Sequence, residues 1–169
     1  MEKENFCFID GQNLNLGIHR LGWKLDLKRF RIYLKDKYGV SKTYYFIGFL
    51  PENHNLYKSL QEYGYVLIFK PTLKTPDGKI KGNCDAELVL QAMIDFPHYK
   101  KAIIVTSDGD FGCLAEYLYR QGKLEAILSP GRAHCSSLLK KAGREKIQFL
   151  DDLRTKLEFQ NRSKEKAPL

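Results

Sequence analysis

Short runs of β-branched and aromatic residues alternate along this chain with segments in which apolar residues recur every three or four positions. The runs predict strands at Asn5–Asp10, Thr43–Gly48, Tyr65–Lys70, Ala102–Ser107, Leu124–Leu128 and Ile147–Leu150. The spacing predicts helices after Asn13, from Asp26 to Gly39, at Asn53–Tyr63, Cys84–Phe96 and Phe111–Gln121, after His134 and from about Asp151. This alternation predicts an α/β fold, with helices on both faces of a mostly parallel central sheet in the strand order of about 3-2-1-4-5.

Two segments depart from the simple alternation. The predicted helix Cys84–Phe96 is apolar on most sides, so we expect it to pack deeply between its neighbours. Pro71–Asn83 contains the turn signal Thr75–Gly78 and predicts a small hairpin or flap that carries several lysines.

The composition is that of one globular domain. A chain of 169 residues can bury a single sizeable core, and we assign the domain to residues 1–158, followed by a basic tail at 159–169 that we expect to be disordered. No apolar run is long enough to span a membrane, and the N-terminus does not resemble a signal peptide. The four cysteines are widely separated, so we expect reduced thiols and a cytoplasmic protein. Oligomeric state is not defined by the sequence, and a homodimer is compatible with it.

The net charge of +8 favours an anionic partner. Basic residues gather in three regions, at residues 20–42, 70–81 and 132–146. Each basic region, taken alone, could equally be an ordinary solvent-exposed surface. Together with the acidic residues at the strand ends, they favour a phosphate backbone, and hence a nucleic acid, as the partner.

Aspartates follow the predicted strands at positions where ligands bind in open α/β sheets. Asp10 ends the first strand, and Asp108 follows the fourth, which the strand order places beside the first. Asp110 comes two residues later, and Asp85 begins the helix that leads back to the fourth strand. We therefore expect four carboxylates to converge at the carboxyl edge of the sheet.

Such a cluster is unfavourable without a counterion. Two unit charges about 4 Å apart repel by about 4 kcal/mol at an effective dielectric near 20, and a bound cation relieves this repulsion. Oxygen ligands alone select Mg²⁺ or Mn²⁺ over zinc. Helix capping could instead explain Asp85, Asp110 or Asn13, but we do not expect it to explain Asp10. Gly109 is expected to permit a sharp turn between two of the aspartates.

Three motifs then resemble a known family. Phe8-Ile9-Asp10-Gly11-Gln12-Asn13, Lys81-Gly82-Asn83-Cys84-Asp85 and Thr106-Ser107-Asp108-Gly109-Asp110-Phe111 are similar to the NYN domain, a PIN-like nuclease group that includes LabA-like bacterial proteins. The resemblance covers about Asn5 to Leu150. It implies a Rossmann-like PIN fold and a divalent-metal-dependent ribonuclease.

The resemblance also implies roles for individual residues. Asp10, Asp85, Asp108 and Asp110 would bind Mg²⁺ or Mn²⁺, with Asn13 supporting them in catalysis. The expected contacts to phosphate are weaker assignments, namely Lys81, Ser107, Arg132 and Ser136. Gln91 stands where many relatives carry a further acidic residue. Because of this difference, the resemblance does not define whether the site binds one metal ion or two.

Three functions follow from these patterns. The first is a metal-dependent ribonuclease that hydrolyses RNA phosphodiester bonds. The second is a non-catalytic RNA-binding or adaptor module of the same fold, which Gln91 favours. The third is another metal enzyme on a similar sheet, such as a phosphatase or a nucleotide-sugar transferase. No phosphate-binding glycine-rich loop is present, so the sequence does not favour a nucleoside triphosphatase.

Overall fold

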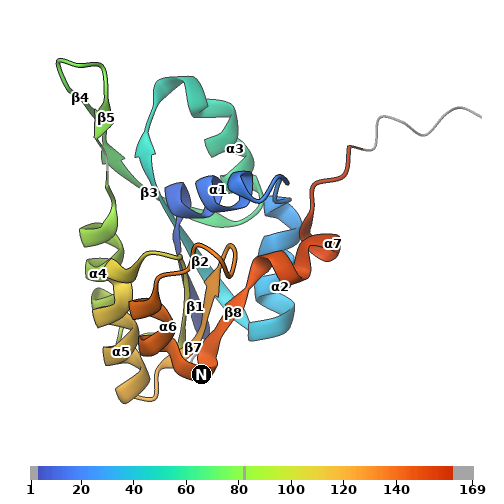
Figure 1. Ribbon diagram of the computed structural model, residues 1–169, viewed down its shortest axis with the longest axis vertical. Helices are drawn as coiled ribbons and strands as arrows, with labels where there is room; N and C mark the ends of the chain where they lie inside the picture. Colours follow the sequence, from blue (N-terminus) through green and yellow to red (C-terminus); the bar gives the residue numbers. More distant parts are fainter. Residues whose placement is uncertain (1–3, 82, 162–169) are drawn as a thin grey trace, which may run out of the picture.

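A six-stranded sheet forms the centre of the molecule (Figure 1). In this computed structural model, residues 4–81 and 83–161 are described, except for the side chains of residues 80 and 81. The strands are β1 (Asn5–Asp10), β2 (Val40–Phe49), β3 (Tyr65–Pro71), β6 (Ala102–Val105), β7 (Leu124–Ser129) and β8 (Ile147–Phe149). Neighbouring strands are parallel, in the order β3-β2-β1-β6-β7-β8. The predicted α/β class is confirmed, and the order predicted for five strands is extended by β8 at one edge.

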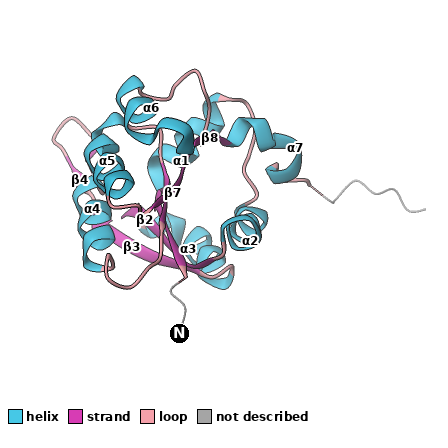
Figure 2. Cartoon of the chain, turned by 90° about the horizontal axis from the view of Figure 1, so that it is seen from below, coloured by secondary structure: helices cyan, strands magenta, loops and turns pink. Residues whose placement is uncertain are grey.

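Helices cover both faces of this sheet (Figure 2). They are α1 (Gly11–Arg20), α2 (Leu27–Tyr38), α3 (His54–Glu62), α4 (Asp85–Ile94), α5 (Gly112–Arg120), α6 (Ser137–Gly143) and α7 (Arg154–Leu157). Residues of α1, α2, α3 and α7 share one hydrophobic core with one face of the sheet, and residues of α4, α5 and α6 share another core with the opposite face. The molecule is therefore a three-layer α/β/α structure.

The two cores follow from the period of two along a strand. In β1, Cys7 and Ile9 belong to the first core, whereas Phe6 and Phe8 belong to the second. Because both faces of β1 are buried, the strand is apolar from Phe6 to Ile9, between Asn5 and Asp10. That aspartate lies where the strand leaves the core.

Helix α4 is less buried than its sequence suggested. Leu88 and Ala92 are buried, but Leu90 is 60% exposed and Ile94 is 55% exposed. Only one side of α4 contacts the sheet, so an apolar surface is left open on the other side. The prediction that this helix packs deeply between its neighbours was wrong.

Shorter elements complete the fold. The predicted hairpin consists of β4 (Leu73–Lys74) and β5 (Ile80–Lys81), which pair antiparallel and extend away from the main sheet (Figure 1). The short 3-10 helices are η1 (Pro51–Asn53), η2 (Gly109–Phe111), η3 (Arg144–Lys146) and η4 (Leu150–Leu153). Among the described residues, no helix has the length and apolar character needed to cross a membrane. No disulfide joins the four cysteines, all of which lie in described parts of the chain.

Candidate metal centre

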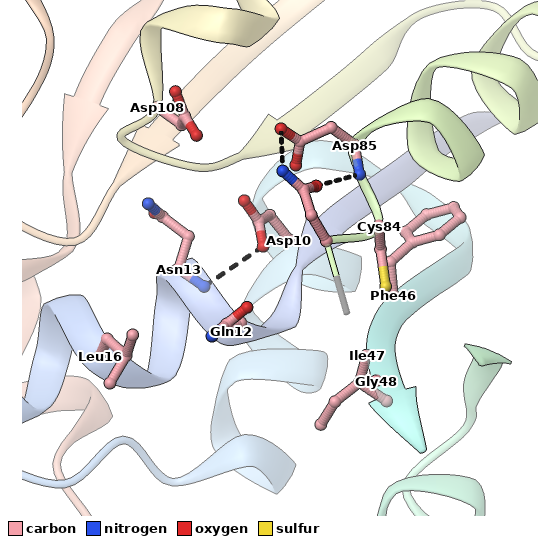
Figure 3. Close-up of a pocket in the computed structure, with 11 residues that line it drawn as sticks. Asp10, Gln12, Asn13, Leu16, Phe46, Ile47, Gly48, Cys84, Asp85 and Asp108 are labelled. Carbon is pink, nitrogen blue, oxygen red and sulfur yellow. Dashed lines mark hydrogen bonds between the residues drawn. The ribbon is translucent and has the colours of Figure 1, made fainter. Parts of the chain in front are cut away.

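Three carboxylates meet at the carboxyl edge of β1 and β6 (Figure 3). Ile9 and Val105 are paired in the sheet, so Asp10 and the loop that carries Asp108 leave neighbouring strands at the same level. Asp85 enters from the first residue of α4. One carboxylate oxygen from each of Asp10, Asp85 and Asp108 lies within 4.8 Å of the other two. Side chains that are distant in sequence are thus close enough to share one cation.

Asp110 is not a member of this close group, although it had been expected there. It lies in η2, one residue beyond Gly109, and its side chain is exposed. Its negative charge still raises the pKa of Asp85. Asp110 is therefore near the centre without being placed among the three converging oxygens.

The strand-end aspartates also cap the elements that follow them. One oxygen of Asp10 accepts a hydrogen bond from the Asn13 amide at 3.2 Å, at the start of α1. One oxygen of Asp108 accepts from the Asp110 amide at 2.9 Å, at the start of η2. The expectation that capping would not explain Asp10 was wrong, because the chain passes directly from β1 into α1. Capping fixes each carboxylate through one oxygen.

Thr106 connects the two aspartates. Its buried hydroxyl donates to the second oxygen of Asp10 at 3.3 Å and accepts from the backbone amide of Asp108 at 3.1 Å. In the structure it links the end of β1 to the loop after β6.

Asn13 and Ser107 form a second link between these segments. The Asn13 side-chain oxygen accepts from the Ser107 amide at 2.8 Å and from its hydroxyl at 3.0 Å. Asn13 therefore contacts Asp10 through its backbone amide rather than through its side chain. This pair ties α1 to the loop that carries Asp108, which holds Asp10 and Asp108 in register.

Asn83 orients Asp85, and the sequence had not singled it out as a site residue. Its side-chain amide donates to the Asp85 carboxylate at 3.0 Å, and its side-chain oxygen accepts from the Asp85 backbone amide at 2.7 Å (Figure 3). An asparagine two residues before an aspartate is the local pattern that could have indicated this contact.

The surroundings of Asp10 and Asp85 disfavour ionisation of their carboxyl groups. Burial raises the pKa of Asp10 to about 6, and the charges of Asp85 and Asp108 add to the effect. Burial also raises the pKa of Asp85, followed by the charges of Asp108 and Asp110. Hydrogen bonds from Asn13 and Asn83 act in the opposite direction but do not cancel it. A cation would remove the repulsion that this geometry creates.

The expected phosphate contacts have different surroundings. The side chain of Lys81 lies outside the described residues. Arg132 forms an ion pair with Asp152 at 3.0 Å. The hydroxyl of Ser136 caps α6 by accepting from the Leu138 amide at 3.2 Å.

The motif glycines are required by close approach rather than by a left-handed backbone. Gly109 begins η2, the tight turn between Asp108 and Asp110, and neither Gly109 nor Gly11 has a positive φ angle. A Cβ at Gly109 would lie 2.4 Å from the Ser136 hydroxyl oxygen, and one at Gly11 would lie 2.7 Å from the backbone oxygen of Phe46. Both glycines let the strand-end aspartates approach neighbouring segments.

This explanation predicts the effect of Gly109→Ala. The added methyl displaces Ser136 and its cap, so we expect the free energy of unfolding to fall by about 1–3 kcal/mol. Gly112→Ala is the matched control, because Gly112 is helical and its nearest neighbours are 3.8 Å away or more. It should be neutral or stabilising by up to about 1 kcal/mol. Urea unfolding measures both, and equal midpoints for the two variants would contradict the explanation.

Comparisons with known proteins agree with this architecture. The family model for the NYN domain matches residues 6–150. The fold is similar to the crystal structure of a protein of unknown function from Vibrio parahaemolyticus RIMD 2210633, with a TM-score of 0.75 and 21% sequence identity. That similarity covers 94% of this chain and 100% of the other, and it concerns the fold alone. A search of curated proteins found no match.

Proposed function

This chain belongs to the NYN domain family, within the PIN-like superfamily, and we propose that it is a divalent-metal-dependent ribonuclease. The observation that carries the proposal is the convergence of Asp10, Asp85 and Asp108, whose carboxylate oxygens lie within 4.8 Å of one another. A cluster with this composition is costly to the protein unless a cation binds it. The family adds a nuclease-like fold, and the net charge of +8 suits an RNA substrate.

The donor set fits Mg²⁺ or Mn²⁺. All three side chains offer oxygen, and the group contains neither histidine nor cysteine. Hard cations of this kind prefer such ligands, whereas zinc sites usually include nitrogen or sulfur. When bound, the ion would supply positive charge that polarises the scissile phosphate and favours ionisation of an attacking water.

The protein's own residues prepare the site for this chemistry. Asn13 and Thr106 hold Asp10 in place, and Asn83 holds Asp85, so these carboxylates need little rearrangement. The pocket is also lined by the apolar side chains of Leu16, Phe46 and Ile47 (Figure 3).

Cleavage of labelled single-stranded RNA tests the proposal. We expect cleavage in the presence of Mn²⁺ or Mg²⁺, and its loss when a chelator is added. Restoration of cleavage by excess metal would separate the requirement for an ion from damage to the protein. Absence of cleavage under all metal conditions would contradict the ribonuclease assignment.

One observation favours a non-catalytic RNA-binding module as the second candidate. Gln91 occupies the position where the family resemblance leads us to expect an acidic residue. Its side-chain amide donates to Asp95 at 2.9 Å, and Gln91 does not line the pocket that contains the three carboxylates. Salt-sensitive RNA binding without metal-dependent cleavage would select this second function.

Asp110 provides a separate prediction about the ion. Because Asp110 is outside the close carboxylate group, we expect Asp110→Asn to weaken Mn²⁺ binding only about 10-fold. Asp85→Asn, which removes one of the three converging carboxylates, should weaken it at least about 100-fold. Isothermal titration calorimetry with Mn²⁺ compares the two variants. Equal losses of affinity would place Asp110 among the direct ligands.

A further inference from the structure

A second cavity adjoins the metal centre along α1. Asn13 and Leu16 line both cavities, and the second one is completed by Arg20 at the end of α1, by Ser107, and by the loop of residues 130–136. We propose that this second cavity binds an RNA phosphate that neighbours the scissile one. This inference rests on the proposed function, since it names how the substrate of that same site is held.

Close packing of α1 on the 130–136 loop forms one side of the cavity. A Cβ at Gly17 would lie 2.6 Å from a ring carbon of Pro130, so the helix and the loop approach more closely than any larger residue would permit. The loop follows β7, which pairs with β6, and its neighbour in space is therefore the loop that carries Asp108. Arg20 reaches the cavity from α1, and His134 reaches it from the 130–136 loop.

The charge of the second cavity is opposite to that of the metal centre. Aspartates 10, 85 and 108 line the first pocket, whereas the residues that line the second include Arg20 and His134 but no aspartate or glutamate. The side chain of Arg20 forms no ion pair or hydrogen bond with the described residues. By contrast, Arg132 in the same loop is engaged by Asp152. A free guanidinium beside a metal centre suits the next phosphate of a bound strand.

Asn13 lies between the two cavities and can serve both. Its side-chain oxygen is occupied by the two donors of Ser107, which leaves its amide N–H groups for a ligand. Arg20 is seven residues further along α1, about 10 Å at the helical rise per residue. The cavities therefore form a path from the carboxylates to the guanidinium, along which a strand would place successive phosphates.

Binding of short single-stranded RNA in the presence of a chelator tests this assignment without cleavage. For the full chain carrying Arg20→Gln, we expect affinity to fall about 10-fold. The slope of log affinity against log salt should decrease by about 1, as for loss of one phosphate contact. His134→Gln should weaken binding in the same direction. Fluorescence anisotropy measures these changes.

The matched control is Arg120→Gln, which removes the same charge at the far end of α5, where Arg120 pairs with Glu116. It should leave RNA affinity unchanged, and neither arginine variant should measurably shift the urea midpoint. RNA with and without a 5′-terminal phosphate distinguishes the source of the ligand. An Arg20 effect on both RNAs identifies an internal phosphodiester, and an effect only on the phosphorylated RNA identifies a terminal phosphate.

The outcomes separate this inference from the proposed function. Unchanged RNA affinity and salt slope in Arg20→Gln would overturn the phosphate cavity even if the unaltered chain cleaves RNA. Binding that depends on Arg20 without any cleavage would support the cavity and remove the ribonuclease assignment. No RNA binding by the unaltered chain would overturn the cavity as well.

Discussion

Asp108→Asn is expected to leave the protein folded and to reduce Mn²⁺-dependent RNA cleavage by at least about 100-fold. Loss of outer-shell partners of a metal commonly costs 10–100-fold, so loss of a direct carboxylate ligand should cost at least about the upper value. The fold should survive because asparagine can accept the same capping hydrogen bond from the Asp110 amide. Initial rates with labelled RNA give the activity, and urea unfolding reports the fold.

An aspartate remote from the site supplies the control for this experiment. Asp36 is exposed on α2, so Asp36→Asn changes the net charge equally but should retain the cleavage rate. Retained Mn²⁺-dependent cleavage by a pure preparation of Asp108→Asn would count decisively against the three-carboxylate centre. The control also excludes a general effect of charge on RNA affinity.

Asp10→Asn is expected to stabilise the metal-free protein above about pH 6 while removing metal binding. The pKa of Asp10 is raised from 3.8 to about 6, chiefly by burial, so the folded state binds this proton more tightly than the unfolded state. The contribution of protonated Asp10 to the stability of the fold is complete below about pH 4 and is lost as the pH rises through about 6. Ionised Asp10 then costs the metal-free protein about 3 kcal/mol. Asparagine carries no charge and avoids this cost.

Urea unfolding with a chelator measures the prediction across this pH range. We expect the free energy of unfolding of Asp10→Asn to be about 1–3 kcal/mol higher than that of the unaltered protein near pH 8. This difference in stability should vanish near pH 4. Mn²⁺ at about 100 times its dissociation constant should then stabilise the unaltered protein by about 2.7 kcal/mol and leave the variant unchanged. A variant that is less stable than the unaltered protein near pH 8 would contradict the argument.

Asp10→Ala separates the charge of this residue from its capping bond. Alanine also removes the charge but cannot accept from the Asn13 amide. We therefore expect it to be about 1 kcal/mol less stable than Asp10→Asn at every pH. Both variants should fail to bind Mn²⁺, which shows that stability and metal binding respond to different properties of the same side chain.

The layered architecture follows from patterns that are visible along the chain. Strand β1 was predicted with its observed bounds, because alternate residues of Asn5–Asp10 must satisfy two apolar cores. The helix α2 was recognised from Asp26 before it and Gly39 after it, and in the structure these residues cap its two ends. Strand periodicity and helix caps depend on residues only a few positions apart, so they can be recognised in the amino-acid sequence alone.

Which side chains share a site depends on how distant segments pack together. The sequence assigned Asp110 and Asp108 equal roles, but only Asp108 lies in the close group, since the turn of η2 carries Asp110 out of it. The sequence did not distinguish the surroundings of two arginines: Arg132 pairs with Asp152, whereas Arg20 lines the second cavity. These outcomes depend on how loops from separate strands approach one another.

The glycine of the Ser107-Asp108-Gly109-Asp110 segment illustrates the difference most directly. From the sequence, Gly109 was explained by a local turn. In the structure its requirement arises from Ser136, a residue far along the chain whose hydroxyl occupies the space of a side chain. Periodicity and helix caps are determined by local sequence patterns, because they depend on interactions between residues that are close in sequence. The distances between the carboxylates are set by strand register and helix docking, which only the folded chain defines.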